Sequence, residues 1–239
     1  MPRALSPAAA GTMEVMHGRA LIVFDLDGTL VDSSRDLGNA VNAALRRIDP
    51  SAPSLALDVV RSFIGSGARS LVARSLVHAG VAFPPEDALP LFLEEYARRL
   101  TEHTRFYPGV EETLDRLSAY PLAVLTNKPG DMSRRILDAL GAQRRFFRVY
   151  GGGDLPSRKP DPDGLLRLMA EAMATPRTTV MVGDSSIDVR TGRAAGARTA
   201  GVRYGFDPES LVSEPPDTLF DSLRELPAFM ESLRATVLR

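Results

Sequence analysis

Short apolar runs rich in β-branched residues recur along the chain, and each stops at a polar or glycine residue. The clearest runs, each with the residue that follows it, are 21–24 before Asp25, 122–125 before Thr126 and 179–182 before Gly183-Asp184. A shorter fourth run covers residues 198–202. Runs without polar positions are typical of strands buried on both faces of a parallel sheet. The pattern therefore predicts a sheet of this kind.

Amphipathic helical patterns fill the intervals between these runs. They cover residues 109–118, 132–140, 163–173 and 187–195. Strands that alternate with helices indicate an α/β fold with a doubly wound, mostly parallel, Rossmann-type sheet. In such a sheet the carboxyl ends of the strands meet at one edge, which is where ligands bind.

Residues 33–104 break the alternation, because they hold helical patterns and no comparable apolar run. We interpret them as a small helical domain inserted into an α/β core of residues 20–32 and 105–239. Residues 1–19 have no such pattern and are interpreted as an N-terminal extension. Since the insertion follows the first strand directly, we expect it to lie over the carboxyl ends of the strands.

Composition narrows the possible functions. The 29 Lys and Arg residues nearly balance the 30 Asp and Glu residues, and aromatic residues make up 6% of the chain. Neither feature favours a nucleic-acid partner. The chain has no Cys, which excludes disulfides and thiolate metal sites. No apolar run is long enough to span a membrane, so we expect a cytoplasmic protein without a membrane partner.

Polar residues of complementary chemistry follow the predicted strands. Asp25 and Asp27 follow the first, and Asp184 follows the third. Carboxylates gathered at one edge of a sheet repel one another unless they share a cation. A divalent metal with oxygen ligands resolves this repulsion, and Mg²⁺ fits best. Lys159, which we expect to open a helix through Lys159-Pro160-Asp161-Pro162, adds an ammonium to the same edge.

Together these residues resemble the four ordered motifs of the haloacid dehalogenase-like hydrolases. The motifs are Asp25-Leu26-Asp27-Gly28-Thr29, Thr126-Asn127-Lys128, Lys159-Pro160, and Gly183-Asp184 followed by Asp188. The resemblance covers residues 20 to about 205 and implies a core of that family, with residues 33–104 as its cap domain. It also implies Mg²⁺-dependent hydrolysis of a phosphate monoester.

The resemblance assigns a role to each motif residue. Asp25 is expected to attack phosphorus and form an aspartyl-phosphate, and Asp27 to serve as general acid and then base. The metal ligands are expected to be Asp25, the Asp27 carbonyl, Asp184 and Asp188. The phosphoryl group is expected to contact Thr126, Asn127 and Lys159, with Gly28 and Thr29 lining the substrate site.

Residues 61–69 (RSFIGSGAR) resemble the cap loop of phosphoglycolate phosphatases. Gly65 and Gly67 allow backbone N–H groups to approach an anion, and Ser66 is expected to cap the next helix. Arg69 is expected to pair with a substrate carboxylate. This interpretation makes 2-phosphoglycolate the expected substrate.

Other functions remain open from the residues alone. They are a phosphatase for a sugar phosphate or a nucleotide, a phosphomutase similar to β-phosphoglucomutase, and a non-catalytic protein that binds phosphate on this fold. Asp184 and Asp188 also suit a helix cap with a first-turn acid, and Arg69 suits a solvated position. In each case we expect a small phosphorylated metabolite as partner, and a monomer or homodimer.

Overall fold

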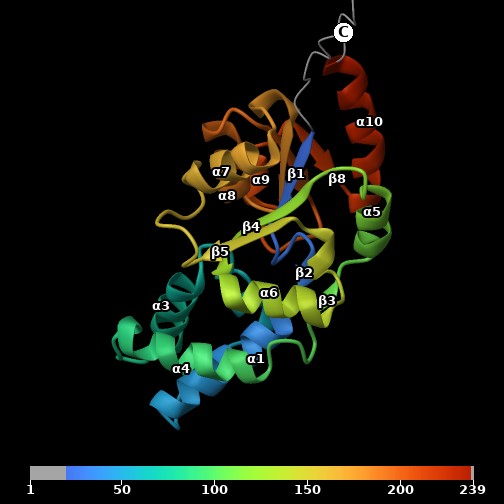
Figure 1. Ribbon diagram of the computed structural model, residues 1–239. Helices are drawn as coiled ribbons and strands as arrows, with labels where there is room; N and C mark the ends of the chain where they lie inside the picture. The colour runs from blue at the N-terminus through green and yellow to red at the C-terminus, as the bar shows by residue number, and fades with distance from the viewer. Residues whose placement is uncertain (1–19, 238–239) are drawn as a thin grey trace, which may run out of the picture.

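The computed structural model describes residues 20–237. The predicted extension, residues 1–19, lies outside the described residues. A six-stranded sheet forms the centre of the molecule in the order β5-β4-β1-β6-β7-β8, and every neighbouring pair runs parallel (Figure 1). Its strands are β1 (Leu21–Phe24), β4 (Leu122–Pro129), β5 (Arg148–Gly152), β6 (Thr179–Gly183), β7 (Arg198–Val202) and β8 (Thr218–Phe220).

The central strand β1 is buried on both faces. It pairs with β4 through Ile22↔Leu122 and with β6 through Ile22↔Val180. Ile22 and Phe24 belong to one hydrophobic cluster, whereas Leu21 and Val23 belong to the other. Since successive strand side chains point to opposite faces, an apolar residue is needed at every position. The expected sheet class is therefore confirmed.

Helices cover both faces of the sheet. One hydrophobic cluster joins the sheet to α7, and the other joins it to α5, α6 and α10. The helices of this part of the molecule are α5 (Val110–Arg116), α6 (Gly130–Ala139), α7 (Asp163–Ala172), α8 (Ser186–Ala194), α9 (Ser210–Ser213) and α10 (Leu226–Val237). Four of them start and end within two residues of the helical patterns in the sequence.

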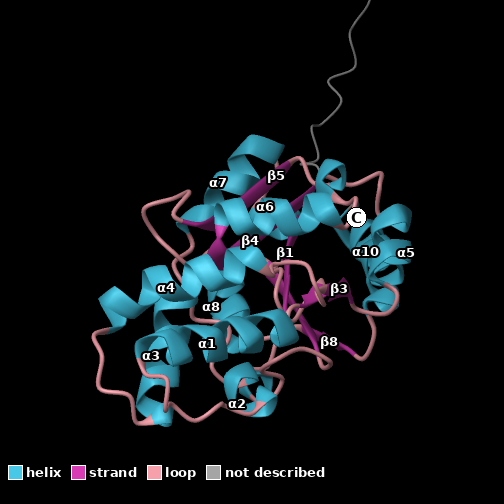
Figure 2. Cartoon of the chain, turned by 90° about the horizontal axis from the view of Figure 1, so that it is seen from below, coloured by secondary structure: helices cyan, strands magenta, loops and turns pink. Residues whose placement is uncertain are grey.

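Four helices lie between the first strand and the rest of the sheet in the chain. They are α1 (Ser34–Ile48), α2 (Leu57–Arg61), α3 (Ala68–Ala79) and α4 (Pro85–Arg98), and they group together away from α5 and α10 (Figure 2). Their apolar side chains share one continuous hydrophobic cluster with a face of the sheet. We call this helical group the cap. Its exact boundaries at residues 33 and 104 stay a prediction.

A short antiparallel pair of strands carries the chain into and out of the cap. β2 (Val31–Asp32) and β3 (Arg105–Phe106) pair through Val31↔Phe106 and Asp32↔Arg105. Beside them, the buried Asp36 carboxylate accepts hydrogen bonds from the backbone N–H groups of His103 and Thr104. These bonds join the first turn of the cap to its last residues.

Two features of local structure differ from the sequence-based prediction. Lys159 does not open a helix, because α7 begins at Asp163 and Lys159 lies in the preceding loop, with a cis peptide bond to Pro160. The edge strands β5 and β8 have no predicted counterpart, because β5 is short and ends in two glycines and β8 has three residues, so neither forms a recognisable apolar run. Across residues 20–237, no helix combines the length and apolar character needed to span a membrane.

Candidate active site

Asp25 and Asp27 lie where the chain leaves β1. The Asp25 N–H continues the sheet by donating to Val182 O at 2.9 Å. Gly28 then turns the chain with φ +88°, and a Cβ at this position would lie 2.2 Å from Asp184 Oδ2. Both observations require glycine. The turn holds Asp184 directly against the residues that follow β1.

Three buried carboxylates meet at this edge of the sheet. Asp25, Asp184 and Asp188 each offer an oxygen, and these oxygens lie within 4.8 Å of one another. They come from the ends of β1 and β6 and from the first turn of α8. The tertiary structure thus brings together the three carboxylates that the sequence nominated as metal ligands.

Lys159 is the cation of this cluster. Its Nζ lies 2.8 Å from Asp25 Oδ1 and 2.6 Å from Asp188 Oδ1, with its side chain almost fully buried. Burial alone disfavours the ammonium, but Asp188 and Asp25 outweigh it and raise the pKa of Lys159. Lys159 is therefore a permanent positive charge beside Asp25.

Three carboxylates outnumber this one ammonium, and the excess of negative charge affects the pKa of Asp184. Burial first, and the neighbouring Asp188 and Asp25 carboxylates second, raise the pKa of Asp184 to about 8. Burial likewise raises the pKa of Asp188, against the effect of Lys159. Asp25 Oδ1 is buried and makes no well-aligned hydrogen bond, although it pairs with Lys159. This chemistry suits a hard divalent cation.

Asp188 also has a structural role. Its carboxylate accepts hydrogen bonds from the Ser185 N–H at 3.2 Å and the Ser185 hydroxyl at 2.8 Å. These bonds belong to a capping box at the start of α8. Helix capping and a place in the carboxylate cluster therefore coexist at Asp188, although the sequence presented them as alternatives.

Thr126 and Asn127 lie within β4, close to its end, and both are buried. Asn127 Nδ2 donates to the Lys159 carbonyl at 3.1 Å and to the Gly65 carbonyl at 3.2 Å. The first bond holds the Lys159 loop against β4, and the second holds the cap loop against the core. Asn127 therefore connects three separate segments of the site.

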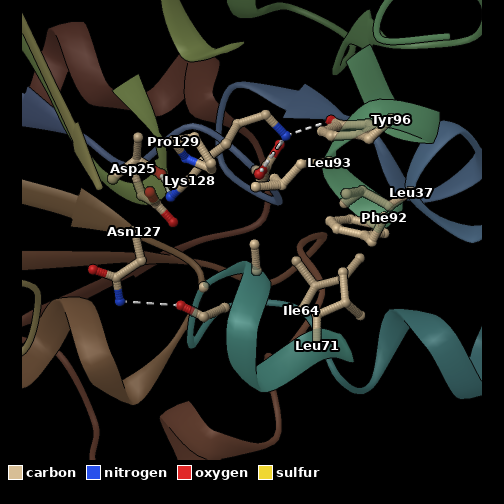
Figure 3. Close-up of a pocket in the computed structure, with 15 residues that line it drawn as sticks. Asp25, Leu37, Ile64, Leu71, Phe92, Leu93, Tyr96, Asn127, Lys128 and Pro129 are labelled. Carbon is tan, nitrogen blue, oxygen red and sulfur yellow. Dashed lines mark hydrogen bonds and ion pairs between the residues drawn. The ribbon is translucent and has the colours of Figure 1, made fainter. Parts of the chain in front are cut away.

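A pocket lies between these strand ends and the cap (Figure 3). Asp25, Asp27, Thr126 and Asn127 line its core side, and Gly65 and Gly67 line it from the cap loop, as expected. Apolar side chains cover the rest of its cap side: Leu37, Ile64, Leu71, Phe92 and Leu93.

The structure does not bring the other two cap-loop residues into this pocket. Arg69 points away, with 64% of its side chain exposed, and pairs with Glu86. Ser66 is exposed, and α3 begins after Gly67 without a side-chain cap, so the expected capping by Ser66 is wrong. Thr29 is buried behind the site, where its hydroxyl donates to Asp184 Oδ1 at 3.3 Å.

Lys128 is the residue that the sequence-based assignment missed. Its Nζ lies 3.0 Å from Asp27 Oδ2 and also contacts the Tyr96 hydroxyl of α4 (Figure 3). Only 3% of the side chain is exposed. Its position directly after Thr126 and Asn127 could have indicated a role in the site, because a lysine at the end of a buried strand contributes little to packing.

Comparison with known proteins places this geometry in a family. The family model of haloacid dehalogenase-like hydrolases matches residues 22–202. The chain belongs to this family. The match spans the cap and five of the six strands of the sheet, all but β8. The expected membership of the haloacid dehalogenase-like family is therefore confirmed.

Relatives within the haloacid dehalogenase-like family point to one subgroup. The phosphoglycolate phosphatase of Pseudomonas putida is 40% identical over 86% of this chain and 78% of its own length. That of Haemophilus influenzae is 38% identical over 86% and 96%. A crystal structure of a predicted phosphoglycolate phosphatase from Haemophilus somnus has a TM-score of 0.81 and 33% identity, covering 88% of this chain and 97% of its own. The expected resemblance to this subgroup is confirmed.

Proposed function

We propose that this protein is a Mg²⁺-dependent phosphomonoesterase that hydrolyses 2-phosphoglycolate through an aspartyl-phosphate on Asp25. The observation that carries the proposal is the buried set of Asp25, Asp184, Asp188 and Lys159 at one edge of the sheet. Packing alone does not explain four ionisable groups gathered in the interior, because burying each of them is costly.

Asp25 is the nucleophile. Its carboxylate oxygen attacks phosphorus, a P–O bond forms, and the bond from phosphorus to the ester oxygen breaks. The Lys159 ammonium beside it attracts the dianionic phosphate toward Asp25, against the repulsion of the carboxylates. The Thr126 hydroxyl donates to a phosphoryl oxygen, and the Asn127 side chain holds the Lys159 loop and the cap loop around the phosphoryl group. Positioning and charge stabilisation are most of what this reaction requires of a protein.

Asp27 moves the protons. It protonates the departing ester oxygen, and the resulting carboxylate then removes a proton from the water that attacks the aspartyl-phosphate. That second displacement releases inorganic phosphate and restores Asp25. The Ser33 hydroxyl donates to Asp27 Oδ1 at 2.6 Å and orients the carboxylate for both steps.

Mg²⁺ suits the carboxylates of this site. Asp25, Asp184 and Asp188 would hold it, together with the backbone carbonyl of Asp27. The raised pKa values of Asp184 and Asp188 reflect negative charge that a cation would balance. When bound, Mg²⁺ neutralises carboxylate and phosphate charge and orients the phosphoryl oxygens. Phe206 N–H donates to Asp184 Oδ2 at 2.6 Å, which fixes the direction of that carboxylate.

The choice of 2-phosphoglycolate is supported by relatives named phosphoglycolate phosphatase, which are 36–41% identical to this chain. The pocket supports a small substrate as well, because the cap closes over it with apolar side chains. The partner would thus be a small phosphorylated metabolite. A cytoplasmic location and a monomeric or homodimeric state stay predictions.

The test is phosphate release from a panel of esters by the purified protein, with Mg²⁺ and with EDTA. The panel contains 2-phosphoglycolate, p-nitrophenyl phosphate, a hexose phosphate and a nucleoside monophosphate. We expect metal-dependent turnover that is fastest on 2-phosphoglycolate, and no turnover by Asp25→Asn, which keeps the shape of the nucleophile but not its charge.

Each other outcome selects a different function. Phosphate release without need of a metal, or equal activity of Asp25→Asn, contradicts the mechanism. Preference for the hexose phosphate or the nucleotide overturns the substrate, and an isomerised sugar phosphate in place of free phosphate indicates a phosphomutase. Binding of phosphate without any turnover indicates a non-catalytic protein.

A further inference from the structure

Lys128 is a buried cation that the proposed chemistry leaves unused. It projects from β4 into the pocket, where Asp27 and Tyr96 are its two partners. Among the described residues that line this pocket, Lys128 is the one with a positive charge. A buried ammonium is costly even when paired, so the position calls for a reason beyond stability.

Lys128 and Lys159 serve two neighbouring aspartates of the site. Lys159 pairs with Asp25 and Lys128 pairs with Asp27. These two aspartates are two residues apart in the chain, and both line the pocket. A ligand held by both cations therefore needs two anionic groups, one for each.

The wall of the pocket disfavours phosphate esters that carry several hydroxyl groups. Opposite the strand ends, the cap offers the side chains Leu37, Ile64, Leu71, Phe92 and Leu93. Sugar hydroxyls placed against this wall would lose their hydrogen bonds to water without replacement, which is unfavourable. A short chain with an anion at each end meets no such penalty, because its middle is apolar.

We infer that Lys128 Nζ binds the carboxylate of the substrate and selects short phosphate esters that carry a carboxylate near the phosphate. Lys128 Nζ contacts both carboxylate oxygens of Asp27, at 3.2 and 3.0 Å, and the Tyr96 hydroxyl. An ammonium has three N–H donors, so one N–H shared between the two Asp27 oxygens leaves one donor for the substrate. This inference rests on the proposed function, since it assigns the second anion of the substrate in the same pocket. It gives Lys128 the role that the sequence suggested for Arg69.

Tyr96 couples this recognition to the cap. Its hydroxyl belongs to α4, its side chain is buried, and it lies against Lys128 both through the hydroxyl and through the face of the ring, 4.4 Å from Nζ. A carboxylate on Lys128 thus lies where the core and the cap meet. Binding of the second anion therefore stabilises the contact between the cap and the core, and this contact keeps water away from Asp25.

The test compares the binding of two non-hydrolysable ligands to the full-length protein in Mg²⁺. Phosphonoacetate carries a carboxylate, and ethylphosphonate has a methyl group in its place. Isothermal titration calorimetry gives a Kd for each, and we expect the wild type to prefer phosphonoacetate by about ten- to hundredfold, as a charge-assisted hydrogen bond provides. In Lys128→Met this preference is expected to fall to less than threefold.

Arg69→Ala is the matched comparison, because it removes a cation that belongs to the cap and lies outside the pocket. We expect the preference for phosphonoacetate to persist in this variant. Its loss there, or its persistence in Lys128→Met, overturns the inference. If Lys128→Met does not fold, Lys128→Gln gives the same test, because glutamine keeps N–H donors for Asp27 and Tyr96 without the charge.

The same measurements separate this inference from the proposed function. Calorimetry reports binding alone, so a preference for phosphonoacetate that depends on Lys128 supports the inference even if no phosphate ester is hydrolysed. Conversely, metal-dependent turnover of 2-phosphoglycolate with an unchanged ligand preference in both Lys128 variants supports the proposed function and rejects Lys128 as the carboxylate site.

Discussion

In the metal-free protein, Asp184→Asn should flatten the dependence of stability on pH. Burial and the neighbouring Asp188 and Asp25 carboxylates raise the pKa of Asp184 to about 8, from 3.8. Between these values the folded state holds a proton that the unfolded chain has released. The stability that this group contributes is therefore fully present below about pH 4 and is lost as the pH rises to about 8.

The size of the effect follows from the same difference. One bound proton changes the free energy of unfolding by about 1.4 kcal/mol per pH unit, so Asp184 accounts for roughly 3 kcal/mol between pH 5 and pH 7. For a chain of this size, 1 kcal/mol corresponds to about 2–4 °C in Tm. We expect the wild-type Tm to fall by about 6–12 °C more than that of Asp184→Asn over this range.

The assay is thermal unfolding followed by circular dichroism, in EDTA at fixed ionic strength and at pH 5, 6, 7 and 8. Asparagine is a matched substitution, because it has the shape of aspartate and can still accept the Phe206 N–H bond. Saturating Mg²⁺ should remove the difference, since a bound cation favours the ionised carboxylate. Parallel Tm curves for the two proteins in EDTA would refute the reasoning.

Two further substitutions test other parts of the site. Asp27→Asn should lower kcat by about 10²–10⁴-fold while leaving the nucleophile in place. The control is Ser51→Ala, at an exposed position between α1 and α2. A loss of kcat below tenfold in Asp27→Asn contradicts the proton-transfer role. Gly28→Ala should lower the urea midpoint of unfolding and weaken Mg²⁺ binding, because the new Cβ would overlap Asp184 Oδ2. Gly80→Ala shares a positive φ but has nothing within 4 Å, so equal losses in both would rule out that contact as the cause.

The α/β class and most of the site were predictable because they depend on local sequence. A strand buried on both faces must be apolar at each position, so β1, β4 and β6 are visible as runs. In a parallel sheet the carboxyl ends of such strands share one edge. The position of Asp25 and Asp184 in the sequence therefore implied their proximity in space.

The short edge strand, by contrast, depends on pairing. β8 has three residues and acquires its conformation by pairing with β7 through contacts such as Val202↔Phe220. No periodic pattern can show itself in three residues, and the order of the six strands is likewise a property of the whole sheet. Long-range pairing, more than local preference, decides such elements.

The two candidate cations, Arg69 and Lys128, show most clearly the division between what the sequence determines and what the tertiary structure decides. The sequence offered Arg69, in a loop that resembles a known cap loop, and it also contained Lys128 after Thr126 and Asn127. Only the docking of the cap decides between them: α4 brings Tyr96 to Lys128, whereas α3 turns Arg69 toward Glu86 and solvent. The sequence alone determined which chemical groups the site has at its strand ends, because strand geometry is local. The tertiary structure decided which of these two cations lies in the pocket, because that depends on how the cap and the core pack together.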